Sequence, residues 1–201
     1  MNVLSNGSYP TQRNNEMIKY FSIPSPLQKA SFGTEVLKCV KSSDGKKLES
    51  LLKQGLSPNP CNAFGDSLIN LICKRGDHEM FKILLSCGAT IEVVDSFGRT
   101  PLHHACWCKE SPFKLVEQML EIDPTMILAK DSQGLSPLEY VSYEKWPEWV
   151  EFFAVNSKKF WSKGSSFRQE KLLVGRADSI SDPPYALSIE DAVLVSAGKA
   201  I

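Results

Sequence analysis

The chain has 201 residues, of which 42% are apolar and 23% are charged, a balance that allows one globular domain with extensions or at most two small domains. Its 23 basic and 23 acidic side chains cancel, so charge gives no case for nucleic acid or an acidic membrane as the main partner. No apolar run approaches the ~20 residues that a membrane span requires, and we expect no membrane association.

The first segment, residues 1–30, is rich in Asn, Ser, Pro and Gln and predicts a partly flexible N-terminal arm. Its opening stretch has no uninterrupted apolar core, so we expect neither a secretory signal nor a membrane anchor there. The stretch "SIPSPLQ" is typical of an extended linker, and the alternative is an arm that ends in a short capping helix. Six cysteines without a zinc-binding spacing predict free, mostly buried thiols in a reducing compartment.

A period of 33 residues organises residues 31–161. Thr34, Ser67 and Thr100 are spaced at this interval, and a fourth copy begins at Ser136, 36 residues after Thr100. The pattern predicts a glycine turn, a hydroxyl N-cap, a short helix, a polar break and a second helix with an apolar stripe. Because neither helix can bury its stripe alone, the copies are expected to stack. Most of the three extra residues in the third copy are expected in "CKESPF".

The third copy carries the most complete motif. In "GRTPLHHA", Thr100 is a candidate N-cap and Pro101 occupies the first helical position, where its missing N–H does no harm. In the fourth copy "SPLE" places Ser136 and Pro137 in the same way and adds the glutamate of a capping box. The second copy, "GDSLINLICKRGD", is degenerate, and the first keeps mainly its second helix.

This period and motif resemble the ankyrin repeat, whose signature includes T-P-L-H-x-A. The resemblance implies an all-α solenoid of about four helix-turn-helix repeats joined by short β-hairpins or loops, with N- and C-terminal extensions. It also implies that His103 makes structural hydrogen bonds near the start of its helix. The residues that carry the motif are Gly98, Thr100, Pro101, Leu102, His103, Ala105, Ser136 and Pro137.

The stretch "HHACWC" raises the alternative of a metal site or a reactive thiol. A zinc site needs three or four converging ligands, and adjacent positions on one helix diverge. Cys106 is expected at a small buried position, and Cys108 nearer the surface, with no evident neighbouring cation to lower the pKa of its thiol. No phosphate-binding, dinucleotide-binding or nucleophile motif occurs either. We therefore expect no catalytic residues, no metal and no cofactor.

Residues 162–201 predict a C-terminal extension with a short helix near 188–198, opened by Ser188. We expect this helix to dock on the last repeat, and the alternative is a helical peptide that other proteins recognise. Basic residues dispersed over 156–176 predict a solvated helix end that runs into a linker. A nuclear-import or acidic-partner patch is the alternative, so the expected location is cytoplasmic, with the nucleus left open.

The resemblance implies a non-catalytic protein-protein interaction module, that is, an adaptor, scaffold or regulatory subunit that is monomeric on its own. A Cys/His-dependent enzyme or a metal- or redox-responsive protein is the alternative. Ankyrin partners usually contact hairpin tips and the inner-helix groove. The tip residues here are Phe64, Asp66, Phe97, Arg99 and Leu135, and the inner-helix residues are Leu71, Lys74, His104, Trp107, Tyr140 and Tyr143. The alternative for Phe64 and Phe97 is packing between adjacent hairpins.

Overall fold

The computed structural model describes residue 20, residues 23–161 and residues 182–199. Residues 1–19 and 21–22 of the N-terminal arm, and the part of the predicted basic linker that begins at residue 162, lie outside this range. Within the described residues the regular secondary structure is helical, and Cys61 and Ser67 form an isolated antiparallel bridge. The connections expected as β-hairpins or loops are therefore tight turns, and the described part of the chain contains no β-strand. None of the helices described has the length and apolar character needed to span a bilayer.

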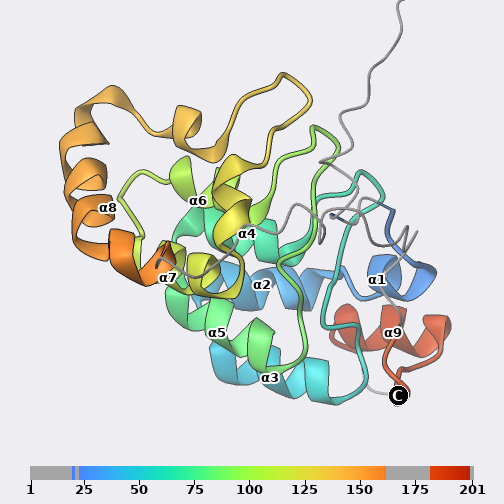
Figure 1. The fold of residues 1–201 in the computed structure, drawn as a ribbon. Helices are drawn as coiled ribbons and strands as arrows, with labels where there is room; N and C mark the ends of the chain where they lie inside the picture. Colours follow the sequence, from blue (N-terminus) through green and yellow to red (C-terminus); the bar gives the residue numbers. More distant parts are fainter. Residues whose placement is uncertain (1–19, 21–22, 162–181, 200–201) are drawn as a thin grey trace, which may run out of the picture.

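Three helix pairs follow one another along the chain and lie side by side (Figure 1). They are α2 (Thr34–Ser42) with α3 (Gly45–Lys53), α4 (Leu68–Arg75) with α5 (His78–Ser86), and α6 (Pro101–Cys106) with α7 (Phe113–Ile122). Their first helices have Gly33, Ser67 and Thr100 as N-caps, so the first one begins one residue earlier than the predicted spacing and lacks the predicted hydroxyl cap at Thr34. Residues 107–112 separate α6 from α7, whereas residues 76–77 separate α4 from α5, so the insertion expected at "CKESPF" lies there.

Side chains cap these helices where the repeat pattern places polar residues. Ser67 Oγ accepts a hydrogen bond from Asn70 N at 3.3 Å, and Asp77 Oδ1 accepts one from Met80 N at 3.1 Å. Each cap satisfies a backbone N–H that has no partner within its own helix. Gly76 ends α4 with φ +68°, a left-handed conformation that glycine adopts without a steric penalty. The two helices of the repeat can therefore reverse direction within two residues.

The fourth unit departs from the other three. It consists of η2 (Pro124–Leu128), η3 (Pro137–Tyr140), η4 (Tyr143–Lys145) and α8 (Trp146–Phe160). The helix predicted to begin at Ser136 is only η3, a four-residue 3₁₀ turn. Glu139 Oε2 nevertheless accepts the expected capping hydrogen bond from Ser136 N at 2.5 Å. The backbone is extended at Val141 and Ser142. Valine and serine are weak helix formers, and the turn has a repeat on only one side to support it.

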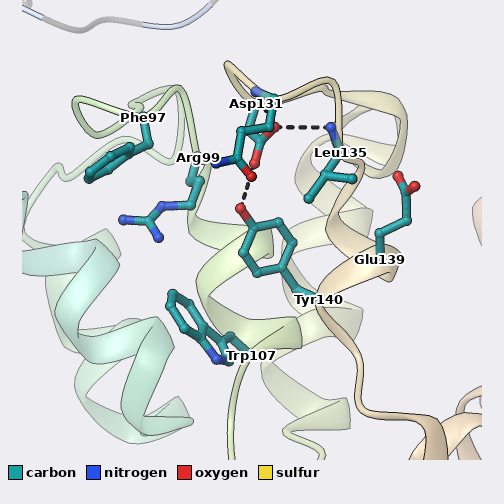
Figure 2. A pocket seen from close by; sticks show the side chains of 8 residues that line it. Phe97, Arg99, Trp107, Asp131, Leu135, Glu139 and Tyr140 are labelled. Carbon is teal, nitrogen blue, oxygen red and sulfur yellow. Dashed lines mark hydrogen bonds between the residues drawn. The ribbon is translucent and has the colours of Figure 1, made fainter.

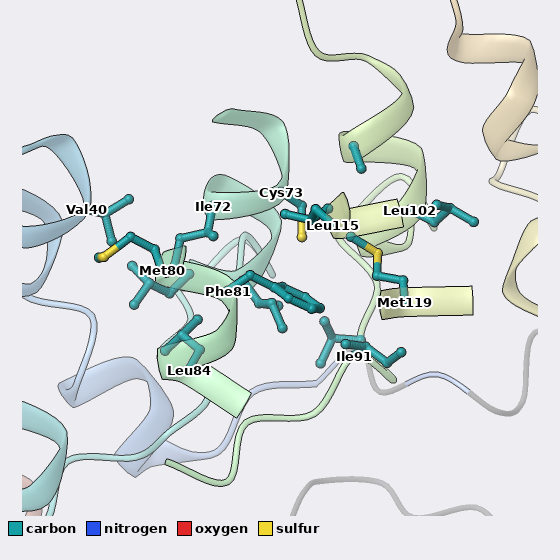
Figure 3. Packing of buried hydrophobic residues seen from close by; sticks show 14 of the residues in the cluster. Val40, Ile72, Cys73, Met80, Phe81, Leu84, Ile91, Leu102, Leu115 and Met119 are labelled. Atoms are coloured by element: carbon teal, nitrogen blue, oxygen red, sulfur yellow. The ribbon is translucent and has the colours of Figure 1, made fainter. Parts of the chain in front are cut away.

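The apolar stripes of neighbouring helices meet in one continuous core (Figure 3). Ile72 of α4, Phe81 and Leu84 of α5, and Leu115 and Met119 of α7 are fully buried in it. Phe81, Leu84, Leu115 and Met119 belong to the apolar stripes that the sequence predicts on the second helices, whereas Ile72 comes from a first helix. Truncating any one of them to alanine should cost about 2–5 kcal/mol, which is a large share of the stability of a small domain.

Aromatic side chains pack α8 against α7. The rings of Phe113 and Phe152 stack with centroids 4.6 Å apart, and Trp149 is buried beside them. The indole N–H of Trp149 donates a hydrogen bond to Ser111 Oγ at 2.9 Å. In the third repeat, α8 thereby packs on α7, while η3 packs on α6.

The helix expected near 188–198 forms, but not where it was expected. It is α9 (Ile189–Ser196), capped by Ser188, and it packs against α1 (Pro26–Ala30) and α2, at the opposite end of the row of helices from α8 (Figure 1). Ser196 Oγ donates a hydrogen bond to Ala30 O at 2.8 Å. The expectation that this helix docks on the last repeat is therefore wrong, since the first repeat receives it.

Candidate functional site

His103 ties the third repeat to the turn that opens the fourth. Its Nδ1 accepts a hydrogen bond from Thr100 N at 3.1 Å. Because a backbone N–H can only donate, the ring proton lies on Nε2, which donates to Leu135 O at 3.1 Å. Burial lowers the pKa of His103, which favours this neutral form. The side chain is fully buried and has a structural position.

The turns between repeats share one hydrogen-bond pattern. Asp95 Oδ1 accepts from the backbone N–H groups of Phe97 and Arg99, both at 2.9 Å. Asn62 and Asp131 make the same two bonds in their own turns. A side chain that bonds its own backbone two and four residues on fixes a tight turn. The tips of successive repeats are therefore held in equivalent conformations.

The carboxylate of Asp95 also holds the side chain of Arg99 in place. Its Oδ2 accepts hydrogen bonds from Nε and Nη2 of Arg99, both at 2.7 Å, and from Nε2 of His104 at 3.1 Å. Burial opposes ionisation of this carboxyl, but the hydrogen bonds from His104 and Arg99 outweigh it and lower the pKa of Asp95. His104, predicted to face the groove, is buried in this network instead of exposed.

Trp107 is the exposed centre of the region. It caps the C-terminus of α6, and 48% of its surface is accessible to solvent. Lys74 Nζ lies 4.9 Å from the centroid of the indole, and the Arg99 guanidinium carbon lies 5.4 Å from it. Both distances are within the range of a cation–π interaction. The ring of Tyr140 meets the indole edge-on with centroids 5.6 Å apart.

A pocket of about 320 Å³ opens beside these two aromatic rings (Figure 2). It is lined by Phe97, Arg99, Trp107, Asp131, Gln133, Leu135, Glu139 and Tyr140. Five of these are residues that the sequence predicts to contact a partner. We refer to those five together with Lys74 as the Trp107 face, which consists of Lys74, Phe97, Arg99, Trp107, Leu135 and Tyr140.

Tyr140 is held in place from two sides. Its hydroxyl donates to Asp131 Oδ2 at 2.5 Å (Figure 2), and the ring of His103 packs against it with centroids 5.4 Å apart. Burial and the hydrogen bond to Asp131 raise the pKa of Tyr140 to about 12, so the hydroxyl stays protonated at neutral pH. The wall of the pocket that Tyr140 forms is thus ordered before anything binds.

The remaining predicted partner residues lie outside the Trp107 face. Phe64 is 77% exposed at the tip of the second turn, where Asp66 accepts a hydrogen bond from Asn62 Nδ2 at 2.8 Å. Leu71 is half-buried against the core, and Tyr143 is 86% exposed.

Sequence reasoning did not assign Asp131, Gln133 or Glu139 to the site, although they line the pocket. The available signal was the match between the turns "DSQG" and "DSFG", which places Asp131 at the position of Asp95.

The cysteines of the "HHACWC" stretch are committed to the interior. Cys106 is buried, and Cys108, expected nearer the surface, is buried as well. The Cys108 thiol contacts Cys73 O at 3.0 Å and Lys74 O at 3.2 Å as a donor, and burial raises its pKa to about 11. Within residues 23–161 and 182–199 no three His, Cys, Asp or Glu side chains are grouped as a metal ion would need.

A family model described as ankyrin repeats (3 copies) matches residues 36–127. The chain is also similar to three ADP-ribosylation factor GTPase-activating proteins of Arabidopsis thaliana. Identity is 31% over 102 residues for AGD4, 37% over 75 for AGD2 and 45% over 56 for AGD1. These segments cover 51%, 37% and 28% of the chain but only 13%, 9% and 6% of the relatives. The chain therefore spans a small part of the length of the relatives it matches.

Proposed function

This chain is an ankyrin-repeat protein, and on that premise we propose that it is a non-catalytic adaptor, scaffold or regulatory subunit that binds another protein through the Trp107 face. Ankyrin repeats are protein-interaction modules, and a stack of repeats presents an extended surface whose side chains decide what binds. The turn tips at Phe64 and Asp66 are proposed to extend the contact beyond the Trp107 face.

One observation carries the proposal. On α6, the two histidines are buried, whereas Trp107 is 48% exposed between two cations and a pocket. Tryptophan, tyrosine and arginine dominate the energetic centres of protein interfaces, and the Trp107 face has one of each. An exposed indole that served only the packing of its own repeat would not need a solvent-accessible pocket beside it.

The order of the face also favours binding. Arg99 is held by Asp95, and Tyr140 is held by Asp131. Immobilising a flexible side chain on binding costs about 0.5–1.5 kcal/mol, and here that ordering already exists in the free protein. The names of the three relatives refer to GTPase activation. We do not extend this role to the chain, because at most 13% of each relative is matched.

Affinity capture with purified protein tests the proposal. Trp107→Ala should lose the captured partner, while Trp146→Ala, which removes an indole 37% exposed at the start of α8, should retain it. Both variants should keep the helical circular dichroism of the wild type. Equal capture by all three proteins would contradict a role for the Trp107 face, and equal loss in both variants would show only a general effect of removing tryptophan.

A further inference from the structure

The basic side chains beside Trp107 repeat along the stack. Lys41, Lys74 and Trp107 are spaced at 33-residue intervals, and they occupy the last turn of α2, the last turn of α4 and the C-cap of α6. Arg75 Nη2 donates to Lys41 O at 3.2 Å, so the ends of α2 and α4 are adjacent. The indole of Trp107 in turn contacts Lys74. Lys41, Lys74 and Trp107 therefore form one continuous line.

The charges of this line are available to a ligand. Lys41, Lys74 and Arg75 are exposed, and within the described residues neither lysine has a carboxylate partner. The carboxylate that follows Arg75 is Asp77, whose oxygens accept hydrogen bonds from Ser43 Oγ at 2.6 Å and Met80 N at 3.1 Å. Basic residues near helix C-termini favour the helix dipole, but this effect requires no alignment across repeats.

The pocket beside Trp107, in contrast to the basic residues of the line, has two carboxylates in its lining. Asp131, Gln133 and Glu139 line it on the side of the fourth unit, while aromatic and aliphatic side chains supply its remaining walls together with Arg99. A carboxylate placed deep in this pocket would meet like charge, whereas an apolar side chain would meet Leu135 and the rings of Trp107 and Tyr140. The surface therefore runs from a pocket with apolar and acidic walls at one end to exposed basic side chains at the other.

The geometry points to an acidic peptide segment of a partner protein as the occupant, with one apolar side chain in the pocket and carboxylates over Lys74 and Lys41. This inference rests on the proposed function and names the class of partner for the same face. Packed helices lie about 8–10 Å apart, and an extended peptide advances about 3.3 Å per residue. The carboxylates should therefore be spaced from the apolar residue, and from each other, by about three positions.

Fluorescence anisotropy with labelled synthetic peptides and the full chain tests the inference. The first peptide carries one leucine with glutamates spaced on both sides of it, the second replaces each glutamate with glutamine, and the third replaces the leucine with serine. The first should bind about tenfold more tightly than either of the others, and its affinity should fall as the salt concentration rises above about 0.15 M. Binding of the glutamine peptide with equal affinity would overturn the inference.

Two charge-reversal variants distinguish binding at this surface from nonspecific attraction between the peptide and the charge of the whole protein. Lys74→Glu should weaken binding of the acidic peptide by about tenfold, whereas Lys114→Glu, an exposed lysine in the first turn of α7, should change it by less than about twofold. Equal effects of the two substitutions would overturn the inference. Tighter binding of a single-stranded oligonucleotide than of the acidic peptide would overturn it as well.

The two proposals fail in different ways. If partner capture requires Trp107 but survives Lys74→Glu, the Trp107 face still binds a protein and only the acidic class of partner is wrong. If capture is also unchanged by Trp107→Ala, both proposals are wrong. Melting temperatures of each variant show that a loss of binding is not a loss of folded protein.

Discussion

Nε2 of His103 donates a hydrogen bond to the backbone carbonyl of Leu135, 32 residues further along the chain, at 3.1 Å. The bond runs from the third repeat into the turn of the fourth unit. Trp107 lies four residues beyond His103, at the C-cap of the same helix, and is exposed. Successive turns of α6 therefore serve two roles: His103 stabilises the packing of repeats, and Trp107 faces solvent.

His103→Ala and Trp107→Ala should therefore have opposite consequences. His103→Ala is expected to lower the free energy of unfolding by about 1–2 kcal/mol, because buried hydrogen bonds are lost. Trp107→Ala should leave the melting temperature nearly unchanged and weaken partner capture directly. Thermal melts and capture of both variants provide the measurement. If Trp107→Ala unfolds the protein while His103→Ala affects only binding, the assignment of the two sides of α6 is reversed.

The second repeat offers the converse experiment at Asn70, the position equivalent to His103. Asn70 is buried, and neither its Nδ2 nor its Oδ1 has a hydrogen-bond partner in the described part of the chain. In Asn70→His, the new ring should reach the carbonyl of Arg99, which corresponds to Leu135. We expect a gain of about 1 kcal/mol in urea unfolding. A lower unfolding midpoint would mean that the second repeat is packed too tightly for an imidazole.

The lowered pKa of His103 predicts a dependence of stability on pH. An unfolded histidine titrates near pH 6.5, so below that value the unfolded chain binds a proton that the folded site resists. The contribution of neutral His103 to the free energy of unfolding should be complete above about pH 6.5. It should decline as the pH falls toward the lower pKa of the folded state, by at most about 1.4 kcal/mol per pH unit. Urea midpoints between about pH 7.5 and 5.5 measure the effect. His103→Gln should show a smaller decline, since the other two histidines remain in both proteins; an equal decline would exclude His103 as its source.

Docking of α9 depends on the absence of a side chain at Gly33. A Cβ at this position would lie 2.3 Å from Ser196 O, too close for any packed arrangement, while φ −104° is open to alanine. Gly33→Ala should displace α9, lower stability by about 1–3 kcal/mol and expose residues 182–199 to limited proteolysis. In a chain that lacks residues 182–199 the same substitution should have little effect. A similar loss in both backgrounds would place the cost elsewhere in the first repeat.

The Cys108 thiol should be inert in the folded protein. Burial raises its pKa to about 11, so little thiolate exists near neutral pH. Cys87 is less buried and should react first with an alkylating reagent, with mass spectrometry of the digested protein as the measurement. Rapid modification of Cys108 before unfolding would favour the redox-responsive alternative.

Much of the fold could be predicted from local signals. The spacing of Thr34, Ser67 and Thr100 predicts where the first helices begin, and the apolar stripes predict the core. The fourth unit differs because its capping signals are correct but only one neighbouring repeat supports it. A capping box starts a helix, whereas its length depends on residues such as Val141 and on packing that a local motif does not contain.

The candidate site could be predicted only in part, for a related reason. The repeat register identifies Trp107, Tyr140 and the turn tips, but it does not tell which polar residue is drawn into the interior. His104 is buried because Asp95, nine residues earlier, folds beneath its turn and accepts a hydrogen bond from it. Docking of α9 on the first repeat depends in the same way on contacts between residues distant in sequence.

The hydrogen bond between Ser196 and Ala30 joins residues separated by 166 positions. While the chain is being synthesised, α1 and α2 must leave the ribosome long before α9 exists. At about 5–20 residues per second, that interval lasts on the order of ten seconds or more. During this time the side of the first repeat that α9 covers in the folded chain has no α9 on it, so chaperones or neighbouring nascent chains can reach it.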